Sequence, residues 1–332
     1  MWLQFVGNAV VLTRAKVFAT ALAHVSWGSC GHGDVVLIPD AGVFSHASPK
    51  ARLEQLGVRA KKGLGQNFLV GQGVVRTIVQ AAEVGHEDFV VEVGPGLGVL
   101  TGELAKAAGR VIAIELDREL AEGLQRGLAE ASNVMVVCAD AREVDTRQLT
   151  GVVPYKLVAN LPYYAASPIL RHFLESEHPP KLAVVMVQRE VARNMTARQG
   201  EMSLMSVGVQ VYGKPRIVAY VPPGAFYPAP KVTSAVVRIE VYPKPAVDVD
   251  DMRGFFAVVR AGFSAPRKQL RNSLSNGLGV PPEEGEPILQ AAGVDPRRRA
   301  ESLTLQEWGS LYWAVARGLK PSRESANASP PP

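Results

Sequence analysis

The chain is poor in the residues that build disulfide or metal scaffolds. Only two cysteines, Cys30 and Cys138, occur among 332 residues, and neither belongs to a Cys-x-x-Cys pair. The six histidines are scattered along the chain without metal-ligand spacing. The sequence therefore predicts no disulfide framework and no metal site, and its cysteine content fits a reducing cytoplasm.

Long apolar runs are also missing. No stretch approaches the roughly 20 apolar residues that a membrane span requires, so we expect no membrane partner. The net charge is +5 and the pI is about 9.2. This mild basic excess is compatible with a nucleic-acid partner but does not establish one. With 47% hydrophobic residues, the chain can bury one large core and a second, smaller one.

The two ends have the composition of segments outside a core. Residues 1–50 are moderately apolar, are broken by Arg14 and Lys16, and then become rich in Gly, Ser and His. Met1–Phe5 lacks the basic start of a secretory signal. We interpret residues 1–50 as a poorly ordered appendage; a misplaced start and a targeting peptide are the alternatives. Residues 321–332 end in three prolines and are predicted to be disordered.

Between these ends, short apolar runs alternate with helical patterns. Strands are predicted at residues 89–93, 111–114, 134–137, 156–159 and 182–187, with helical patterns between most of them. Strands separated by helices of about 10–15 residues indicate βαβ units and a mostly parallel sheet. Three later runs, at 207–212, 216–221 and 234–241, lack intervening helices and are predicted as antiparallel final strands. This α/β domain is expected to span residues 51–243.

A second domain follows a Pro-rich linker at residues 242–245. From there to residue 320 the apolar residues recur at helical spacing, as in Phe255, Phe256 and Val259. We expect a small all-helical domain over residues 244–320.

The ends of the first three predicted strands carry residues suited to a nucleoside. Gly94, Gly96 and Gly98 form a turn after the first strand, where missing Cβ atoms allow a ligand to approach the backbone. Glu115 lies 21 positions after Gly94 and can bind two ribose hydroxyls, and Asp140 can meet the amino edge of an adenine. A dinucleotide site usually reads Gly-x-Gly-x-x-Gly, but here the third glycine comes one place early. The spacing favours S-adenosylmethionine, a cofactor without phosphates. A tight turn without a ligand and solvated strand ends are the alternatives.

A fourth motif follows the strand at residues 156–159. In Asn160-Leu161-Pro162-Tyr163-Tyr164, the Asn160 side-chain oxygen and the Leu161 carbonyl can each accept a hydrogen bond from an amino group on a flat ring. Pro162 stiffens the turn, and Tyr163 offers an aromatic face for stacking. The alternative is a proline-containing turn from strand to helix with two core tyrosines.

Five motifs in this order resemble one family, the KsgA/RsmA small-subunit ribosomal RNA adenine dimethyltransferases. The motifs occupy residues 65–69, 92–96, 115–117, 160–164 and 226–232. The similarity covers roughly residues 55–317, including the motif at 266–272 in the helical domain. It implies a Rossmann-like methyltransferase fold and transfer of methyl groups from S-adenosylmethionine to N6 of two adjacent adenosines. These adenosines lie in a hairpin loop near the 3′ end of small-subunit rRNA, and the family acts late in subunit assembly.

The resemblance also implies roles for individual residues. The family's cofactor contacts fall on Asn67, Leu69, Gly94, Glu115, Asp140 and Asn160; Gly96 joins them through the glycine turn. The target adenine has to leave its base stack before it can react. Tyr163 and Phe226 are the candidates for the two aromatic side chains that clamp the flipped-out base. The expected phosphate contacts are Lys61, Lys62, Arg267, Lys268 and Arg271, of which the last three have helical spacing; a solvated basic face is the alternative. We expect a monomer that binds immature small subunits.

Two positions depart from the family pattern. Asn194 stands where the family usually has Arg, and Met202-Ser203 replaces a common Tyr-Gly. Both positions affect the expected fit to RNA rather than the cofactor residues. Two further functions stay open: a large-subunit rRNA methyltransferase of the antibiotic-resistance type, and a non-catalytic RNA-binding assembly or transcription factor.

Overall fold

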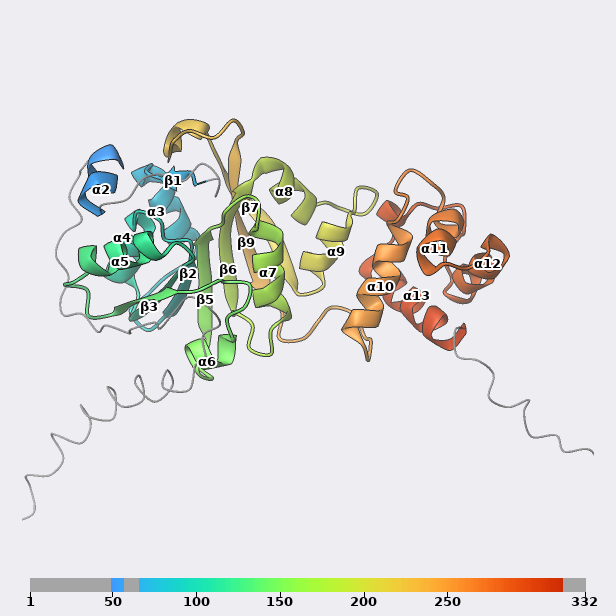
Figure 1. Ribbon diagram of the computed structural model, residues 1–332. Helices are drawn as coiled ribbons and strands as arrows, with labels where there is room; N and C mark the ends of the chain where they lie inside the picture. Colours follow the sequence, from blue (N-terminus) through green and yellow to red (C-terminus); the bar gives the residue numbers. More distant parts are fainter. Residues whose placement is uncertain (1–48, 57–65, 319–332) are drawn as a thin grey trace, which may run out of the picture. The chain divides into compact units, whose positions relative to one another are not determined.

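The computed structural model describes residues 49–56 and 66–318 (Figure 1). Lys61, Lys62, residues 1–48 and the tail at 321–332 lie outside these ranges. The described residues form two compact units. The first comprises the described residues up to Ala192 together with Lys214–Pro243, and the second comprises Arg193–Gly213 and the residues from Lys244 on. Among the described residues, no helix is long and apolar enough to cross a membrane.

The first unit is built on a seven-stranded sheet with the strand order β4-β3-β2-β5-β6-β9-β7. Its strands are β2 (Phe89–Val93), β3 (Arg110–Glu115), β4 (Val134–Cys138), β5 (Tyr155–Asn160), β6 (Leu182–Gln188), β7 (Gly213–Val221) and β9 (Ser234–Val241). The pairs from β4 to β6 are parallel, and β9 runs antiparallel to β6. The expected mostly parallel α/β fold is confirmed. Two short strands, β1 (Phe68–Leu69) and β8 (Phe226–Tyr227), form a separate antiparallel pair.

The helices of this unit are α2 (Pro49–Leu56), α3 (Gln72–Ala81), α4 (Val99–Ala107), α5 (Arg118–Gly127), α6 (Thr146–Thr150) and α7 (Ala166–Glu175), and α8 (Arg189–Met195) begins in it and ends in the second unit. A 3-10 turn, η2 (Pro223–Ala225), precedes β8. Two helices begin at aspartates whose carboxylates accept hydrogen bonds from the first turn: Asp117 accepts from Glu119 N–H, and Asp145 accepts from Arg147 and Gln148 N–H. Such caps satisfy backbone donors that a helix start leaves unpaired.

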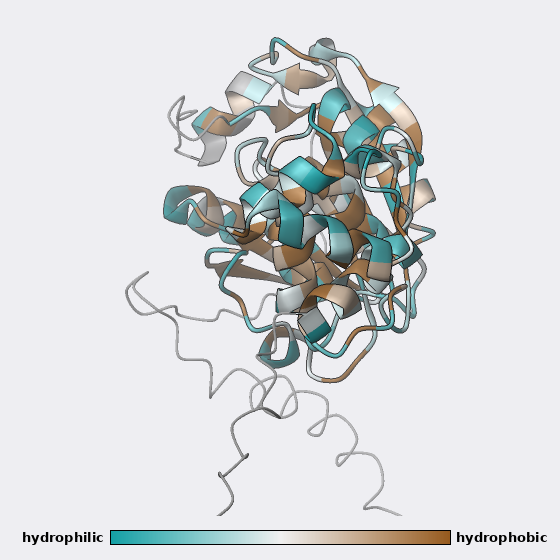
Figure 2. Ribbon diagram, turned by 90° about the vertical axis from the view of Figure 1, so that its right-hand side faces the viewer, coloured by the Kyte–Doolittle hydropathy of each residue, from teal (hydrophilic) through white to brown (hydrophobic). Residues whose placement is uncertain are grey.

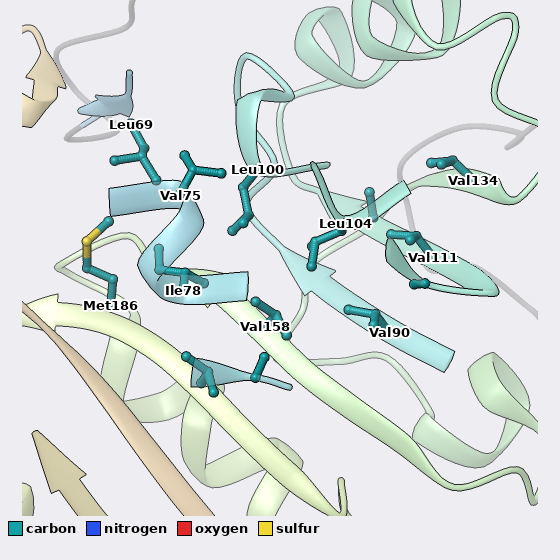
Figure 3. Close-up of a cluster of buried hydrophobic side chains, with 14 of the residues drawn as sticks. Leu69, Val75, Ile78, Val90, Leu100, Leu104, Val111, Val134, Val158 and Met186 are labelled. Atoms are coloured by element: carbon teal, nitrogen blue, oxygen red, sulfur yellow. The ribbon is translucent and has the colours of Figure 1, made fainter. Parts of the chain in front are cut away.

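One face of the sheet packs against α3, α4 and α5. Alternate strand residues such as Val90, Val111 and Val158 lie in one buried cluster with Ile78 of α3 and Leu104 of α4 (Figure 3). The parallel strands are mostly hydrophobic because a parallel sheet is covered on both faces. This packing fixes the sheet edge on which the glycine turn lies.

The predicted strand at residues 207–212 is wrong. These residues lie in and just after helix α9 (Leu204–Gln210), and they belong to the second unit. Ser203 caps the helix: its hydroxyl accepts from Ser206 N–H, while the Ser206 hydroxyl accepts from Ser203 N–H. A short apolar run that is buried on all sides fits a strand or a helix equally well, so the cap decides the outcome.

The second unit is otherwise helical, as expected. Its further helices are α10 (Met252–Gly262), α11 (Leu270–Leu278), α12 (Pro282–Ala291) and α13 (Leu305–Gly318), with a 3-10 turn, η3 (Ala300–Ser302). Hydrophilic and hydrophobic residues alternate along these helices in Figure 2. Phe255 and Trp308 are fully buried in this unit. Two glycines permit close helix contacts: an added Cβ would lie 2.4 Å from the Trp308 ring at Gly262 and 2.3 Å from the Ala261 backbone at Gly277.

We predict that Gly277→Ala destabilises the helical unit by about 1–3 kcal/mol, because the new methyl group has to push α11 away from α10. Gly208→Ala is the matched control, since its added Cβ in α9 meets nothing within 4 Å. The control should be neutral or stabilising by up to about 1 kcal/mol. Urea unfolding followed by tryptophan fluorescence measures both, and equal midpoints would contradict the proposed close contact.

Candidate active site

The candidate site lies where four neighbouring parallel strands end. In the spatial order β4, β3, β2 and β5, the strand ends carry Asp140, Glu115, Gly94 and Asn160. Parallel strands place their carboxyl ends on one edge of the sheet, which is where open α/β sheets bind ligands. These four residues line one cavity, together with Asn67 and Leu69, which the sequence singled out.

The glycine turn needs a backbone that other residues rarely adopt. Gly94, Gly96 and Gly98 have φ values of 69°, 54° and 72°. The turn is also tightly packed, because a Cβ at Gly94 would lie 3.3 Å from the Asn160 carbonyl oxygen and one at Gly96 would lie 3.0 Å from the Phe68 ring. Glycine is therefore required twice over, by conformation and by space. The turn ends at Gly98, directly before α4.

Glu115 is buried at the end of β3 and is held by the backbone. Its carboxylate accepts hydrogen bonds from Gly96 N–H at 3.2 Å and from Asp117 N–H at 3.0 Å. Burial raises the pKa of Glu115, while these two hydrogen bonds oppose the shift. The side chain thus ties the glycine turn to the start of α5 and lines the cavity at the same time.

Asp140 follows β4 and forms an ion pair with Arg142. Arg142 Nε donates to Asp140 Oδ1 at 3.0 Å, and the Arg142 backbone N–H donates to the same oxygen at 2.9 Å. This pairing with the guanidinium lowers the pKa of Asp140, so the carboxylate stays ionised at neutral pH. It can still accept a further hydrogen bond from a ligand, since a carboxylate offers about four lone-pair positions.

The turn after β5 is anchored at both ends. Leu161 N–H donates to the Met186 carbonyl of β6 at 3.2 Å, and Ala165 N–H donates to the Pro162 carbonyl at 3.0 Å. The Tyr163 hydroxyl shares a hydrogen bond of 2.6 Å with the hydroxyl of Ser234, the first residue of β9. Ser234 is fully buried, so this bond fixes the Tyr163 ring beside the cavity.

The space inside the cavity, counted together with the solvent at its open mouth, measures about 1070 Å³. The predicted residues that line it are Asn67, Leu69, Gly94, Gly96, Glu115, Asp140, Asn160, Leu161, Pro162 and Tyr163. Within the described part of the chain, no group of three or more His, Cys, Asp or Glu side chains could hold a metal ion.

Other lining residues were missed by the sequence reasoning. Phe68, Glu92, Arg142 and Tyr164 all line the cavity. Phe68 and Glu92 lie within the motifs at 65–69 and 92–96, whose register could have pointed to them. Tyr164 is 58% exposed and lies within the motif at 160–164. Only the fold reveals Arg142, because its role depends on the ion pair with Asp140.

Phe226 does not lie where the clamp hypothesis requires it. It pairs with Leu69 through β8 and β1, but its ring is 4% exposed and belongs to the hydrophobic core cluster. Only Leu69 of this pair lines the cavity among the described residues. In this arrangement the Tyr163 ring lines the cavity and the Phe226 ring packs in the core.

Arg267 and Lys268 are exposed, but they do not lie on a helix. They occupy the turn between α10 and α11, and Arg271 alone belongs to α11. The proline at 266 explains the turn, since the residue before a proline avoids helical geometry. No carboxylate lies within ion-pair distance of Arg267 or Lys268 in the described residues, whereas Arg271 lies 3.8 Å from Glu286.

Comparison with known proteins decides the family. The model of the ribosomal RNA adenine dimethylase family matches residues 57–316. The chain belongs to this family. A ribosomal RNA small subunit methyltransferase A of Dehalococcoides mccartyi is 47% identical over 266 residues, which cover 80% of this chain and 91% of that protein. Its counterpart in Moorella thermoacetica is 46% identical over 272 residues, covering 79% and 94%.

Solved structures of similar proteins agree on the fold. The 23S rRNA methyltransferase ErmE matches with a TM-score of 0.59 and 28% identity, covering 75% of this chain and 100% of its own. A dimethyladenosine transferase from Plasmodium falciparum matches with a TM-score of 0.63 and 24% identity, covering 76% and 98%. The second likeness concerns the fold alone.

We predict that Tyr163→Phe and Ser234→Ala each destabilise the protein by about 1 kcal/mol, because each leaves a partly or fully buried hydroxyl without its partner. The double variant should cost clearly less than the sum of the two, since both remove the same hydrogen bond. Thermal unfolding of the four proteins measures the coupling, and strict additivity would mean that the two hydroxyls do not interact.

Proposed function

We propose that this protein transfers methyl groups from S-adenosylmethionine to N6 of two adjacent adenosines in the 3′-terminal hairpin loop of small-subunit rRNA. Family membership and the relatives' names support this function. The observation that carries it is the arrangement of Asp140, Glu115, Gly94 and Asn160 along one edge of the sheet, with Tyr163 beside them.

The residues present fit the cofactor. The positive-φ glycine turn lets a ligand approach the backbone, and a carboxylate at Glu115 and another at Asp140 offer acceptors for ribose hydroxyls and an adenine amino group. Asn67, Leu69 and Asn160 complete the proposed set on the same cavity. When bound, S-adenosylmethionine supplies a methyl group that is already activated by its sulfonium charge.

The residues after β5 would then act on the target base. The adenine amine is a weak nucleophile because its lone pair is delocalised into the ring. The Asn160 side-chain oxygen and the Leu161 carbonyl oxygen accept its two hydrogens, which favours a pyramidal nitrogen and stabilises the positive charge that develops on it. Pro162 stiffens the turn, and Tyr163 stacks on the base. Holding the amine nitrogen in line with the methyl group supplies most of the remaining rate enhancement, so no strong general base is required.

The finer expectations about partners belong to this proposal. We expect the protein to act as a monomer, and an immature ribosomal subunit as substrate supports a cytoplasmic location. Arg267, Lys268 and Arg271 would bind RNA phosphates through the second unit. Light scattering after size exclusion tests the monomer.

We expect the purified protein to transfer labelled methyl groups from S-adenosylmethionine to immature small subunits and not to large-subunit RNA. Two labelled methyl groups on each of two adenosines are the expected product, read by nucleoside mass spectrometry. Label in large-subunit RNA would instead support the resistance-type activity, which the likeness to ErmE keeps as the second candidate. RNA binding without any transfer would support a non-catalytic factor.

We predict that Asn160→Ala lowers the rate of methyl transfer by at least about 10²-fold, because one acceptor for the amine is lost. RNA affinity should stay near that of the unaltered protein.

The double variant Arg267→Ala/Lys268→Ala should behave in the opposite way. We expect weaker RNA binding, a salt dependence of the RNA affinity reduced by roughly one to two phosphate contacts, and unchanged cofactor affinity. Single-turnover kinetics and filter binding separate the two, and lost RNA binding in Asn160→Ala would make that residue structural.

A further inference from the structure

One carboxyl group in the cavity has no role in the function proposed above. Glu92 is the fourth residue of β2, two positions before the glycine turn, and it lines the cavity. Its side chain is 1% exposed. Within the described part of the chain, its Oε2 atom is buried without a hydrogen-bond partner. Buried polar atoms of this kind are rare and call for an explanation.

The neighbours of Glu92 on the sheet are apolar. It lies beside Ala113 of β3 and Val158 of β5, both fully buried. From α4 it faces Thr101, whose buried hydroxyl also has no well-formed hydrogen bond among the described residues. No lysine or arginine acts on it. The remaining charged groups of the cavity are Glu115, Asp117 and the Asp140–Arg142 pair, and of these Glu115 alone affects Glu92.

These surroundings keep the carboxyl group neutral. Burial raises the pKa of Glu92 to about 8, the Thr101 hydroxyl opposes this slightly, and the charge of Glu115 adds to it. Glu115 differs because two backbone N–H groups stabilise its carboxylate. The cavity therefore holds, beside the hydrogen-bonded carboxylates of Glu115, Asp117 and Asp140, one carboxylic acid that can still lose its proton.

The proposed cofactor carries two positive charges, on its sulfonium and on its α-ammonium group. A cation in the cavity favours the ionised form of a nearby buried acid. We propose that Glu92 is a positioning residue that is protonated in the cofactor-free protein and ionises when S-adenosylmethionine binds, releasing one proton to solvent. This inference rests on the proposed function, because it takes the cavity as the cofactor site.

Ionisation of Glu92 would make cofactor affinity depend on pH. Well above pH 8 the group is ionised in both states, and at low pH it is protonated in both. Between these limits each binding event releases up to one proton, so the Kd should fall by at most about tenfold per pH unit. Methyl transfer removes the sulfonium charge. Binding of S-adenosylhomocysteine should therefore release fewer protons than binding of S-adenosylmethionine. The ratio of the two affinities should then shift further toward the cofactor as the pH rises.

Calorimetry of S-adenosylmethionine binding at pH 7, in two buffers of different ionisation enthalpy, tests the proposal. Glu92→Gln keeps the shape of the acid but cannot ionise, and Glu130→Gln, an exposed position, is the matched control. The α-amino group of the cofactor itself titrates near pH 8, and its contribution is common to all three proteins. We expect the unaltered protein and Glu130→Gln to release at least about half a proton more than Glu92→Gln, and to bind the cofactor several-fold more tightly.

The outcomes separate this inference from the proposed function. Equal proton release with and without Glu92 would overturn the inference while the function stands. If the unaltered protein does not bind S-adenosylmethionine, with no heat in either buffer, the function itself is overturned. If Glu92→Gln fails to fold, ¹³C NMR of glutamate carboxyl groups in the unaltered protein decides. One carboxyl should titrate near pH 8 without cofactor and at clearly lower pH with it, and an unmoved midpoint would refute the proposal.

Discussion

The parallel register of β4, β3, β2 and β5 is the constraint on which the site depends. Each of these strands is paired along its full length with its neighbour, so their last residues have to meet at one edge. Hydrophobic packing against α3, α4 and α5 holds the sheet, and the polar strand ends line the cavity. The residues at the strand termini therefore supply the chemistry of the site, and the packed core fixes their positions.

Much of this could be predicted from the sequence. Apolar runs closed by Gly, Asp, Glu or Asn give both the strand and the functional residue at its end, and parallel pairing then brings those residues together. For this reason Asp140, Glu115, Gly94 and Asn160 could be named before the fold was known, and the cavity unites them. The family resemblance supplied Asn67 and Leu69, for which no local pattern would have given a role.

Other features depend on tertiary context. The run at 207–212 is buried on nearly all sides, so the spacing of its hydrophobic residues does not distinguish a strand from a helix. The reciprocal hydrogen bonds of Ser203 and Ser206 start a helix there. Phe226 sits in a polar, proline-rich sequence but faces the core through the β1–β8 pair. In the sequence Glu92 is an ordinary motif residue. Only the positions of the neighbouring strands and α4 show that its buried Oε2 atom lacks a hydrogen-bond partner among the described residues.

The assignment of Arg193–Gly213 to the helical unit has a consequence for how the protein can be divided. The polypeptide passes between the two units after Ala192, after Gly213 and again after Pro243. Within the second unit, Ala246 N–H donates to the Val211 carbonyl at 2.7 Å, and the Tyr212 and Phe256 rings stack with their centroids 6.2 Å apart. A fragment ending at Pro243 would thus carry α9 stripped of its packing partners. Isolating the first unit therefore requires removing residues 193–213 and rejoining the chain, and isolating the second requires joining those residues to the segment that begins at Lys244.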